Sequence, residues 1–147
     1  MQPDTALSSP FVSQGGEDQI CAALFDAIGV RSRCAVEFGA GDGVRHSNTA
    51  YFRDVLGWRV VLFDVAPQSE LVHRALITAE NVNAIFDDQE IPTDLDLLSI
   101  DIDGNDLWVW KAVTYRPRIV VIEFNPRWRT VKSRVVPYDP TRHDWDR

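Results

Sequence analysis

The sequence has few residues of the types that build sulfur- or imidazole-based sites. Among 147 residues there are two cysteines, Cys21 and Cys34, and three histidines. Both cysteines fall within apolar patterns, and no other cysteine or histidine follows at a metal-ligand spacing, so neither a disulfide framework nor a zinc site is expected. We expect both cysteines to be buried as small hydrophobic side chains.

Long apolar runs are also missing. The longest, such as residues 119–122, have the length of a strand, whereas a membrane-spanning helix needs roughly 20 apolar residues. Residues 1–10 are acidic and polar where a signal peptide would carry basic residues before an apolar stretch. We therefore expect a cytoplasmic protein with no membrane partner.

The net charge of −7 leaves no overall excess of basic residues. Binding to a nucleic-acid backbone requires a basic face, so we expect no nucleic-acid partner. Residues 116–147 differ from the rest, with eight Lys and Arg against four Asp and Glu. We interpret residues 125–147 as an extended basic tail that docks on an acidic body; the alternative is a site for an anionic substrate.

Strand-like and helix-like segments alternate along the chain. This alternation predicts a single α/β domain over residues 1–147, with a Rossmann-like, mostly parallel sheet of about five strands and helices on both faces. The expected helices cover about 16–29, 47–56, 67–79 and 105–113. The expected strands are Cys34–Phe38, Arg59–Asp64, Asn81–Phe86, Leu95–Asp101 and Arg118–Phe124.

Two of these elements carry detailed burial predictions. The first helix places Ile20, Leu24 and Ile28 on one helical face, which we expect to lie on the core, with Cys21 and Phe25 beside it. The segment 118–124 is apolar at nearly every position and is therefore expected to be buried on both faces, as parallel strands are.

A glycine-rich stretch, EFGAGDG at residues 37–43, directly follows the first predicted strand. Gly39 and Gly41 allow a sharp turn and a close approach of the backbone to a ligand. The spacing matches neither the dinucleotide fingerprint nor a phosphate-binding loop.

Asp64 ends the second predicted strand, where an acid can accept hydrogen bonds from ribose hydroxyls; the alternative is a solvated aspartate. Asp87, after the third predicted strand, is our candidate acceptor for an adenine amino group, although acidic loop residues are common.

The segment SIDIDGND at residues 99–106 concentrates acids at the end of the fourth predicted strand. Like charges so close must share a cation, share a proton or point apart. Asp101 and Asp103 are candidate ligands for a divalent ion such as magnesium. Alternatively, Asn105 and Asp106 cap the next helix. We expect Asp101 to face the cofactor or substrate and Asp106 to be largely structural.

Glu123, near the carboxyl end of the fifth predicted strand, is costly to bury unless it is paired or faces a cleft. It is a candidate substrate contact, or a partner for Arg127 or Arg129. His143 in the tail is a candidate base, although a lone histidine is more often incidental.

In combination these motifs resemble the FkbM-type methyltransferases, a branch of the class I S-adenosylmethionine-dependent enzymes. The segments that carry the resemblance are SQGGED (13–18), EFGAGDG with SNT (47–49), LLSIDIDGND (97–106), WVWKAV (108–113) and VVIEFNP (120–126). The resemblance implies a methyltransferase fold, S-adenosylmethionine as cofactor, and O-methylation of a small metabolite or sugar as the activity.

The resemblance also implies roles for individual residues. Glu37 would lie near the ammonium group of the cofactor, and Gly39, Ala40 and Gly41 would line its methionine and ribose part. Asp64 would bind the ribose, and Gln14 and Glu17 would belong to an amino-terminal segment that closes over the site. Asp101 would reach the reacting end of the cofactor and act in catalysis, with Asp103 beside it.

Enzymes of this kind continue past a segment like YDPTRHDW (138–145) into another helix and two more strands, whereas this sequence stops at Arg147. The last two of the usual seven strands are thus expected to be absent. Because an exposed edge strand invites pairing, we expect a homodimer. Two other functions stay open: a catalytically inactive binding or assembly module, and a metal-dependent hydrolase or transferase that uses the acids between Asp101 and Asp106.

Overall fold

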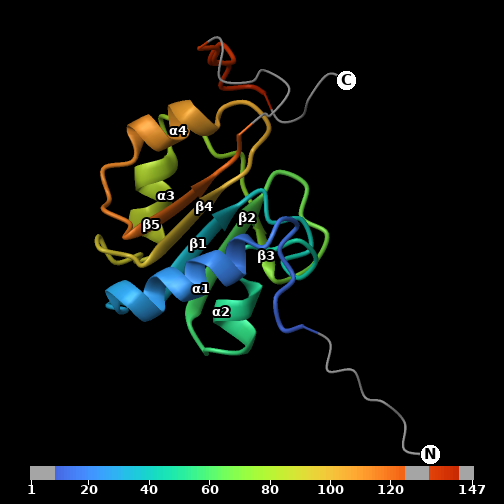
Figure 1. Cartoon of the computed structure of the whole chain (residues 1–147). Helices are drawn as coiled ribbons and strands as arrows, with labels where there is room; N and C mark the ends of the chain where they lie inside the picture. Colours follow the sequence, from blue (N-terminus) through green and yellow to red (C-terminus); the bar gives the residue numbers. More distant parts are fainter. Residues whose placement is uncertain (1–8, 125–132, 143–147) are drawn as a thin grey trace, which may run out of the picture.

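The computed structural model, which describes residues 9–124 and 133–142, contains a five-stranded, all-parallel sheet of Rossmann-like type (Figure 1). The strand order is β3-β2-β1-β4-β5. This confirms the predicted fold class. The strands are β1 (Cys34–Phe38), β2 (Arg59–Asp64), β3 (Val72–Arg74), β4 (Leu97–Ile100) and β5 (Ile119–Ile122).

Helices cover both faces of the sheet (Figure 1). Helices α1 (Glu17–Ile28) and α2 (Ala50–Asp54) lie on one face, and α3 (Val82–Asp88) and α4 (Asp106–Ala112) lie on the other. Side chains alternate between the faces along each strand. In β1, Ala35 packs in the cluster of α1 and α2, whereas Val36 and Phe38 pack in the cluster of α3 and α4.

The third strand is not where the sequence pattern placed it. Residues 67–79 contain the short strand β3 instead of a helix, and the predicted strand Asn81–Phe86 is largely helix α3. In α3, Val82 and Phe86 stand four residues apart and are both fully buried, which is the spacing of one helical face. Before β3, the backbone N–H of Gln68 donates to the carbonyl of Gly41, so the segment is bonded to the glycine loop.

The buried face of α1 also differs from the prediction. Ile20, Leu24 and Ile28 are 60%, 45% and 48% exposed. The buried positions are Asp18, Cys21 and Phe25. The ring of Phe25 packs edge-on against two aromatic rings, those of Phe52 and Trp58. Hydrophobicity favoured the aliphatic face, but aromatic packing and the hydrogen-bonded Asp18 determine the orientation of the helix.

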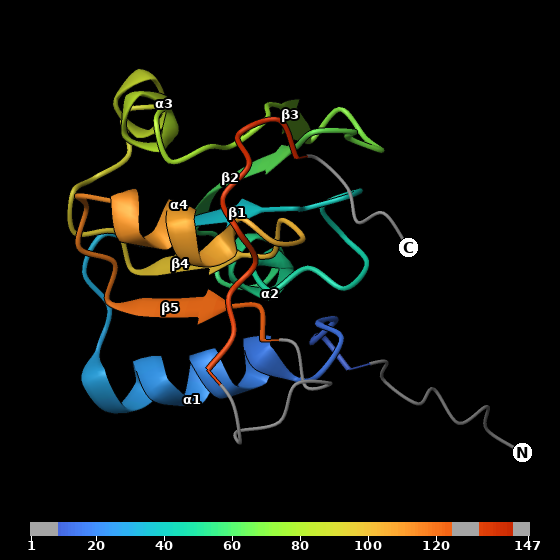
Figure 2. The same ribbon diagram turned by 90° about the horizontal axis from the view of Figure 1, so that it is seen from above.

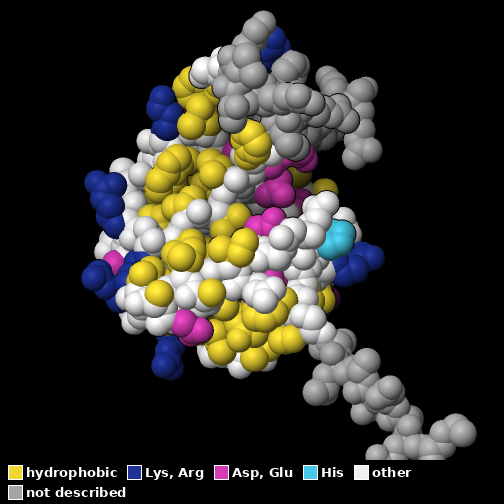
Figure 3. Space-filling view, viewed as in Figure 1, with side chains coloured by type: hydrophobic (Ala, Val, Ile, Leu, Met, Phe, Trp, Pro, Cys, Tyr) yellow, Lys and Arg dark blue, Asp and Glu magenta, His cyan; other side chains and the backbone are white. Residues whose placement is uncertain are grey.

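Strand β5 is not buried on both faces as predicted. Ile119, Val120 and Val121 are half-buried and Ile122 is 37% exposed, because β5 is an edge strand that pairs with β4 alone within the described residues. Hydrophobic side chains are also visible over the face that carries α1 and α2 (Figure 3). The homodimer stays a prediction.

No helix among the described residues has the length and apolar character to cross a membrane.

The orientation of α1 can be tested with a pair of alanine substitutions at neighbouring positions. Phe25→Ala should lower the free energy of unfolding by about 3–5 kcal/mol, because it leaves a cavity beside two aromatic rings. Leu24→Ala should cost less than about 1 kcal/mol, since the side chain is already near half exposed. Urea denaturation measures both; a larger loss for Leu24→Ala would contradict this orientation.

Candidate functional site

The glycine loop that follows β1 is in very close contact with the segment that follows β4. Gly39 has φ +75°, and a Cβ atom there would lie 1.7 Å from the carbonyl oxygen of Asp101. Only glycine therefore fits. Gly41 has φ +58°, and a Cβ atom there would meet nothing within 4 Å, so space is open beside the loop. Ala40 is buried and packs with Leu62 and Val72 beneath the loop.

Asp64, at the end of β2, fixes the same loop from the neighbouring strand. Its Oδ2 accepts the backbone N–H of Gly41 at 2.8 Å, and its Oδ1 accepts the N–H of Ala66 at 2.8 Å. Because an ionised carboxylate has about four lone-pair sites, each oxygen keeps capacity for a further donor. The side chain is half-buried, so those sites face an accessible cleft.

A cavity of about 220 Å³ opens beside Asp64 at the carboxyl ends of the strands. Ligands of open α/β sheets bind at this edge. One side of the cavity is apolar, with Ala75, Leu76 and Ile77 from the segment after β3. The remaining lining residues are Gly39, Phe63, Asp64, Val65, Ala66, Gln68, Ile102, Asp103 and Arg142.

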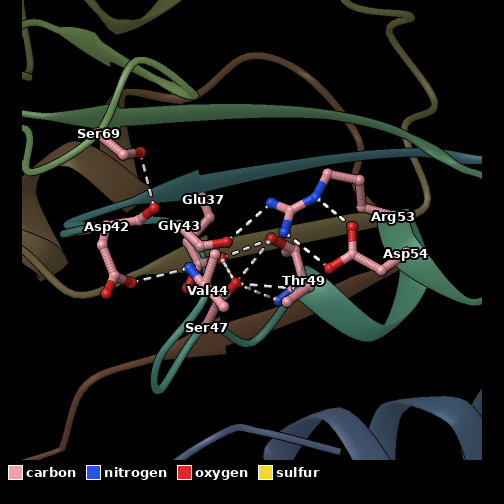
Figure 4. Close-up of polar contacts among 10 residues, drawn as sticks. Glu37, Asp42, Gly43, Val44, Ser47, Thr49, Arg53, Asp54 and Ser69 are labelled. Atoms are coloured by element: carbon pink, nitrogen blue, oxygen red, sulfur yellow. Dashed lines mark hydrogen bonds and ion pairs between the residues drawn. The ribbon is translucent and has the colours of Figure 1, made fainter. Parts of the chain in front are cut away.

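Glu37 is buried, with 4% exposure, and its carboxylate binds the segment before α2 (Figure 4). Its Oε2 accepts the hydroxyls of Ser47 at 2.7 Å and Thr49 at 2.5 Å, and its Oε1 accepts the N–H of Asn48 at 2.9 Å. The side-chain amide of Asn48 in turn donates to Ser99 on β4. These bonds compensate the burial of the charge, and they join β1, β4 and the start of α2.

Further polar contacts fix the outer side of the glycine loop (Figure 4). Arg53 donates to the carbonyl of Gly43 at 2.8 Å, and Ser69 donates to the carbonyl of Asp42 at 2.8 Å. The carboxylate of Asp42 accepts a side-chain hydrogen bond from Arg45 and the backbone N–H groups of Val44 and Arg45. These bonds, the side-chain bond first, lower the pKa of Asp42 to about 2. The loop is thus ordered by the chain's own contacts.

Three carboxylates, those of Asp101, Asp103 and Glu123, stand together beside the cavity. One oxygen atom from each lies within 4.8 Å of the others. All three side chains reach solvent, and Figure 3 shows acidic side chains gathered on this part of the surface. Asp103 has φ +55°, a strained conformation for a residue with a Cβ atom. The sequence motif indicated Asp101 and Asp103 as a candidate metal pair; the parallel register of β4 and β5 adds Glu123.

The environment raises the pKa of two of these carboxyl groups. Partial desolvation, followed by the charges of Asp106, Asp103 and Glu37, raises the pKa of Asp101 to about 6. Partial desolvation and then the charge of Asp101 raise the pKa of Glu123 to about 7. The hydrogen bond between the two groups lowers the pKa of Asp101 and raises that of Glu123.

Asp106 is structural, in agreement with the expectation from the sequence. Its carboxylate accepts the backbone N–H groups of Ile102 and Gly104, both at 2.8 Å, and so closes the turn that carries Asp103. Asn105 is buried and makes no side-chain cap bond to α4. Its side-chain amide donates to the carbonyl of Asp139 at 2.7 Å instead.

Of the nine residues predicted to bind the cofactor, two line the cavity, Gly39 and Asp64. The other seven do not: Glu37, Ala40, Gly41 and Asp101, whose contacts are given above, and Gln14, Glu17 and Asp87. Gln14 is exposed, and Glu17 accepts the N–H of Gly15 within its own segment. The buried acid there is Asp18, which sequence reasoning did not single out. Asp87 belongs to α3 and accepts the hydroxyl of Tyr115, because the strand expected before it is a helix.

The segment 133–142, which we call the strap, is the described part of the predicted basic tail and is hydrogen-bonded to the rest of the domain. It has no helix or strand and crosses the sheet from the β5 side to the β3 side (Figure 2). Trp108 donates to the carbonyl of Val136 at 2.8 Å, and the hydroxyl of Tyr138 accepts the N–H of Ala79 at 3.1 Å. Its Arg142 lines the cavity. The basic composition was the only signal in the sequence. Arg127, Arg129 and His143 lie outside the described residues.

Comparisons with protein-family models, with curated proteins and with solved structures found no match. The resemblance to FkbM-type methyltransferases therefore stays a prediction.

The raised pKa values make stability depend on pH. Carboxyl groups titrate near 4 when unfolded, so Asp101 and Glu123 hold more protons in the folded state than in the unfolded chain between about pH 4 and pH 7. The cluster's contribution to stability therefore falls as pH rises through this window. Glu123→Gln should raise the melting temperature at pH 8, where Glu123 is ionised, and change it little at pH 4.

Glu70→Gln is the matched control, because Glu70 is exposed and lies outside the cluster. It should change the melting temperature equally little at both pH values. If Glu123→Gln gave the same small shift at both pH values, the repulsion between these carboxylates would be refuted.

Proposed function

We propose that this chain binds S-adenosylmethionine in the cavity beside Asp64 and transfers its methyl group to the hydroxyl of a small metabolite or sugar. The observation that carries the proposal is the convergence of Gly39, Asp64 and an apolar wall on one cavity at the carboxyl ends of the strands. Asp64 keeps free lone pairs suited to a ribose diol, and residues 75–77 offer an apolar surface suited to a flat base. These residues fit the nucleoside part of the cofactor.

The charge of the cleft favours this cofactor over a phosphorylated one. The carboxylates of Asp64 and Asp103 line the cavity, and one oxygen atom each of Asp101 and Glu123 lies within 4.8 Å of an oxygen of Asp103. S-adenosylmethionine carries a positive sulfonium and a positive ammonium group, both of which such a cleft attracts. A dinucleotide or nucleoside triphosphate would instead bring negative phosphates against these carboxylates.

The proposed reaction is an in-line displacement. S-adenosylmethionine supplies an electrophilic methyl group; the acceptor oxygen forms a bond to the methyl carbon while the carbon–sulfur bond breaks and its electrons stay on sulfur. The protein aligns the reactants and accepts a proton. Asp101 is the proposed base, since a carboxyl group with a pKa of about 6 is mostly ionised at neutral pH and takes the proton of the acceptor hydroxyl. Asp103 is proposed to orient the acceptor from the same cluster.

Cofactor binding is tested by calorimetry and by thermal melting with S-adenosylmethionine. A ligand that binds only the folded state stabilises it by about 2.7 kcal/mol at a hundred times its dissociation constant, so the melting temperature should rise. Asp64→Asn should weaken binding at least about 10-fold, because hydrogen bonds to a charged acceptor contribute about 1.5–3 kcal/mol each.

Asp88→Asn makes the same chemical change at an exposed position of α3 away from the cavity and should bind like the wild type. Absence of binding by the wild-type protein would refute the proposed cofactor. Binding without methyl transfer to any acceptor tested would support the inactive module.

The role of Asp101 is tested by the pH profile of methyl transfer. The rate should rise with pH through about 6 and then level off, because the base must be ionised. Asp101→Asn should lower kcat by about 10²–10⁴-fold while S-adenosylmethionine still binds. An unchanged kcat in this variant would remove Asp101 from the mechanism.

The second candidate is metal-dependent hydrolysis or group transfer, which the spacing of Asp101, Asp103 and Glu123 favours. Carboxylate oxygens are the ligands that magnesium takes in proteins. In that case activity would require a divalent ion, would be lost on addition of a chelator, and would not depend on S-adenosylmethionine. The same assays, run with and without magnesium, separate the two functions.

A further inference from the structure

The strap is fixed at several points, and these points place Arg142 at the cavity. Asn105 exchanges two hydrogen bonds with the backbone of Asp139, at 2.7 Å and 3.3 Å. The N–H of Arg142 then donates to the carbonyl of Asp139 at 3.0 Å in a tight turn. Gly104 makes room for the arginine side chain, since a Cβ atom there would lie 3.2 Å from Cδ of Arg142.

The guanidinium of Arg142 is held at the cavity with one of its nitrogen atoms, Nε, unsatisfied. Within residues 9–124 and 133–142, its Nε is the one buried side-chain nitrogen or oxygen atom without a hydrogen-bond partner. None of the ion pairs among these residues involves Arg142. A buried donor without a partner carries a desolvation cost of about 1–3 kcal/mol, more for a charged group. A buried donor without a partner calls for an explanation, and at a cavity wall a ligand can supply the missing acceptor.

We propose that Arg142 is a ligand-binding residue, supplied by the strap, whose guanidinium donates hydrogen bonds to an acceptor atom of the ligand in the cavity. The inference rests on the proposed function, under which two parts of the cofactor offer such acceptors: the α-carboxylate, and the ring nitrogens of the base. The carboxylate would give the stronger, charge-assisted bond.

The test compares two ligands and two variants by calorimetry. The ligands are S-adenosylhomocysteine, which has the carboxylate and the base, and methylthioadenosine, which has the base alone. Arg142→Gln should weaken the binding of S-adenosylhomocysteine at least about 10-fold. If methylthioadenosine binds this variant as tightly as it binds the wild type, the carboxylate is the acceptor. If the binding of methylthioadenosine is weakened as much as that of S-adenosylhomocysteine, the base is the acceptor.

Arg116→Gln is the matched control, because Arg116 is exposed, precedes β5 at the other end of the strand, and does not line the cavity. Binding of both ligands should be unchanged in this variant. The melting temperature without ligand gives a second readout. Arg142→Gln should leave it equal or higher, because it removes a donor that no protein atom satisfies.

Each remaining outcome overturns the inference. Unchanged affinity for S-adenosylhomocysteine in Arg142→Gln would show that the side chain does not touch the ligand. A lower melting temperature with unchanged affinity would make Arg142 a structural residue. If the wild-type protein bound neither ligand, the proposed function would fail and the inference with it; binding by the wild type with no effect of Arg142→Gln removes the inference alone.

Discussion

The close contact between the loops after β1 and β4 is the constraint on which the rest of the site depends. A Cβ atom on Gly39 would lie 1.7 Å from the carbonyl oxygen of Asp101, so the two segments touch through backbone alone. This contact brings the end of β4, with its acids, beside the glycine loop. Asp64 completes the arrangement from the other side of β1, since its carboxylate bonds the N–H of Gly41. Three strand ends are thereby held around one cavity before any ligand arrives.

That arrangement concentrates negative charge, and the chain compensates only part of it. Glu37 and Asp106 are buried and satisfied by hydrogen bonds, three from residues 47–49 and two from backbone N–H groups. Asp101 and Glu123 receive less compensation, and their pKa values rise to about 6 and about 7. The buried acids thus order the loops, whereas the accessible acids keep an unfavourable charge that a cation or a proton relieves. Carboxyl groups whose pKa values are raised by desolvation and neighbouring charges are candidates for a functional site.

The sequence predicted the parts of the fold that local pattern determines. The bounds of β1 and β2 and the fold class follow from apolar runs next to glycine and acidic residues. Asp106 is structural as expected, but it bonds backbone N–H groups of the turn before α4. The errors lie where tertiary packing overrides pattern. Residues 81–86 are a helix because Val82 and Phe86 share a face, and α1 buries aromatic and hydrogen-bonded side chains in preference to its aliphatic ones. Glu123 joined the acidic cluster only through the register between β4 and β5, which a single sequence does not reveal.

The strap shows how a charge asymmetry along the chain becomes a local feature of the cavity. Arg142 comes from the basic carboxyl-terminal part of the sequence, and the cavity it lines holds Asp64 and Asp103 from the acidic body. A uniformly acidic cavity would attract any cation, such as a metal ion or a polyamine, without regard to shape. One guanidinium among carboxylates instead favours a ligand that carries a positive and a negative group at a fixed separation, because each group then meets a protein group of opposite charge. A simple cation is repelled by the guanidinium. An amino acid joined to a sulfonium has this distribution, so under the proposed function the unpaired donor of the strap would add selectivity to a cleft whose acids supply only attraction.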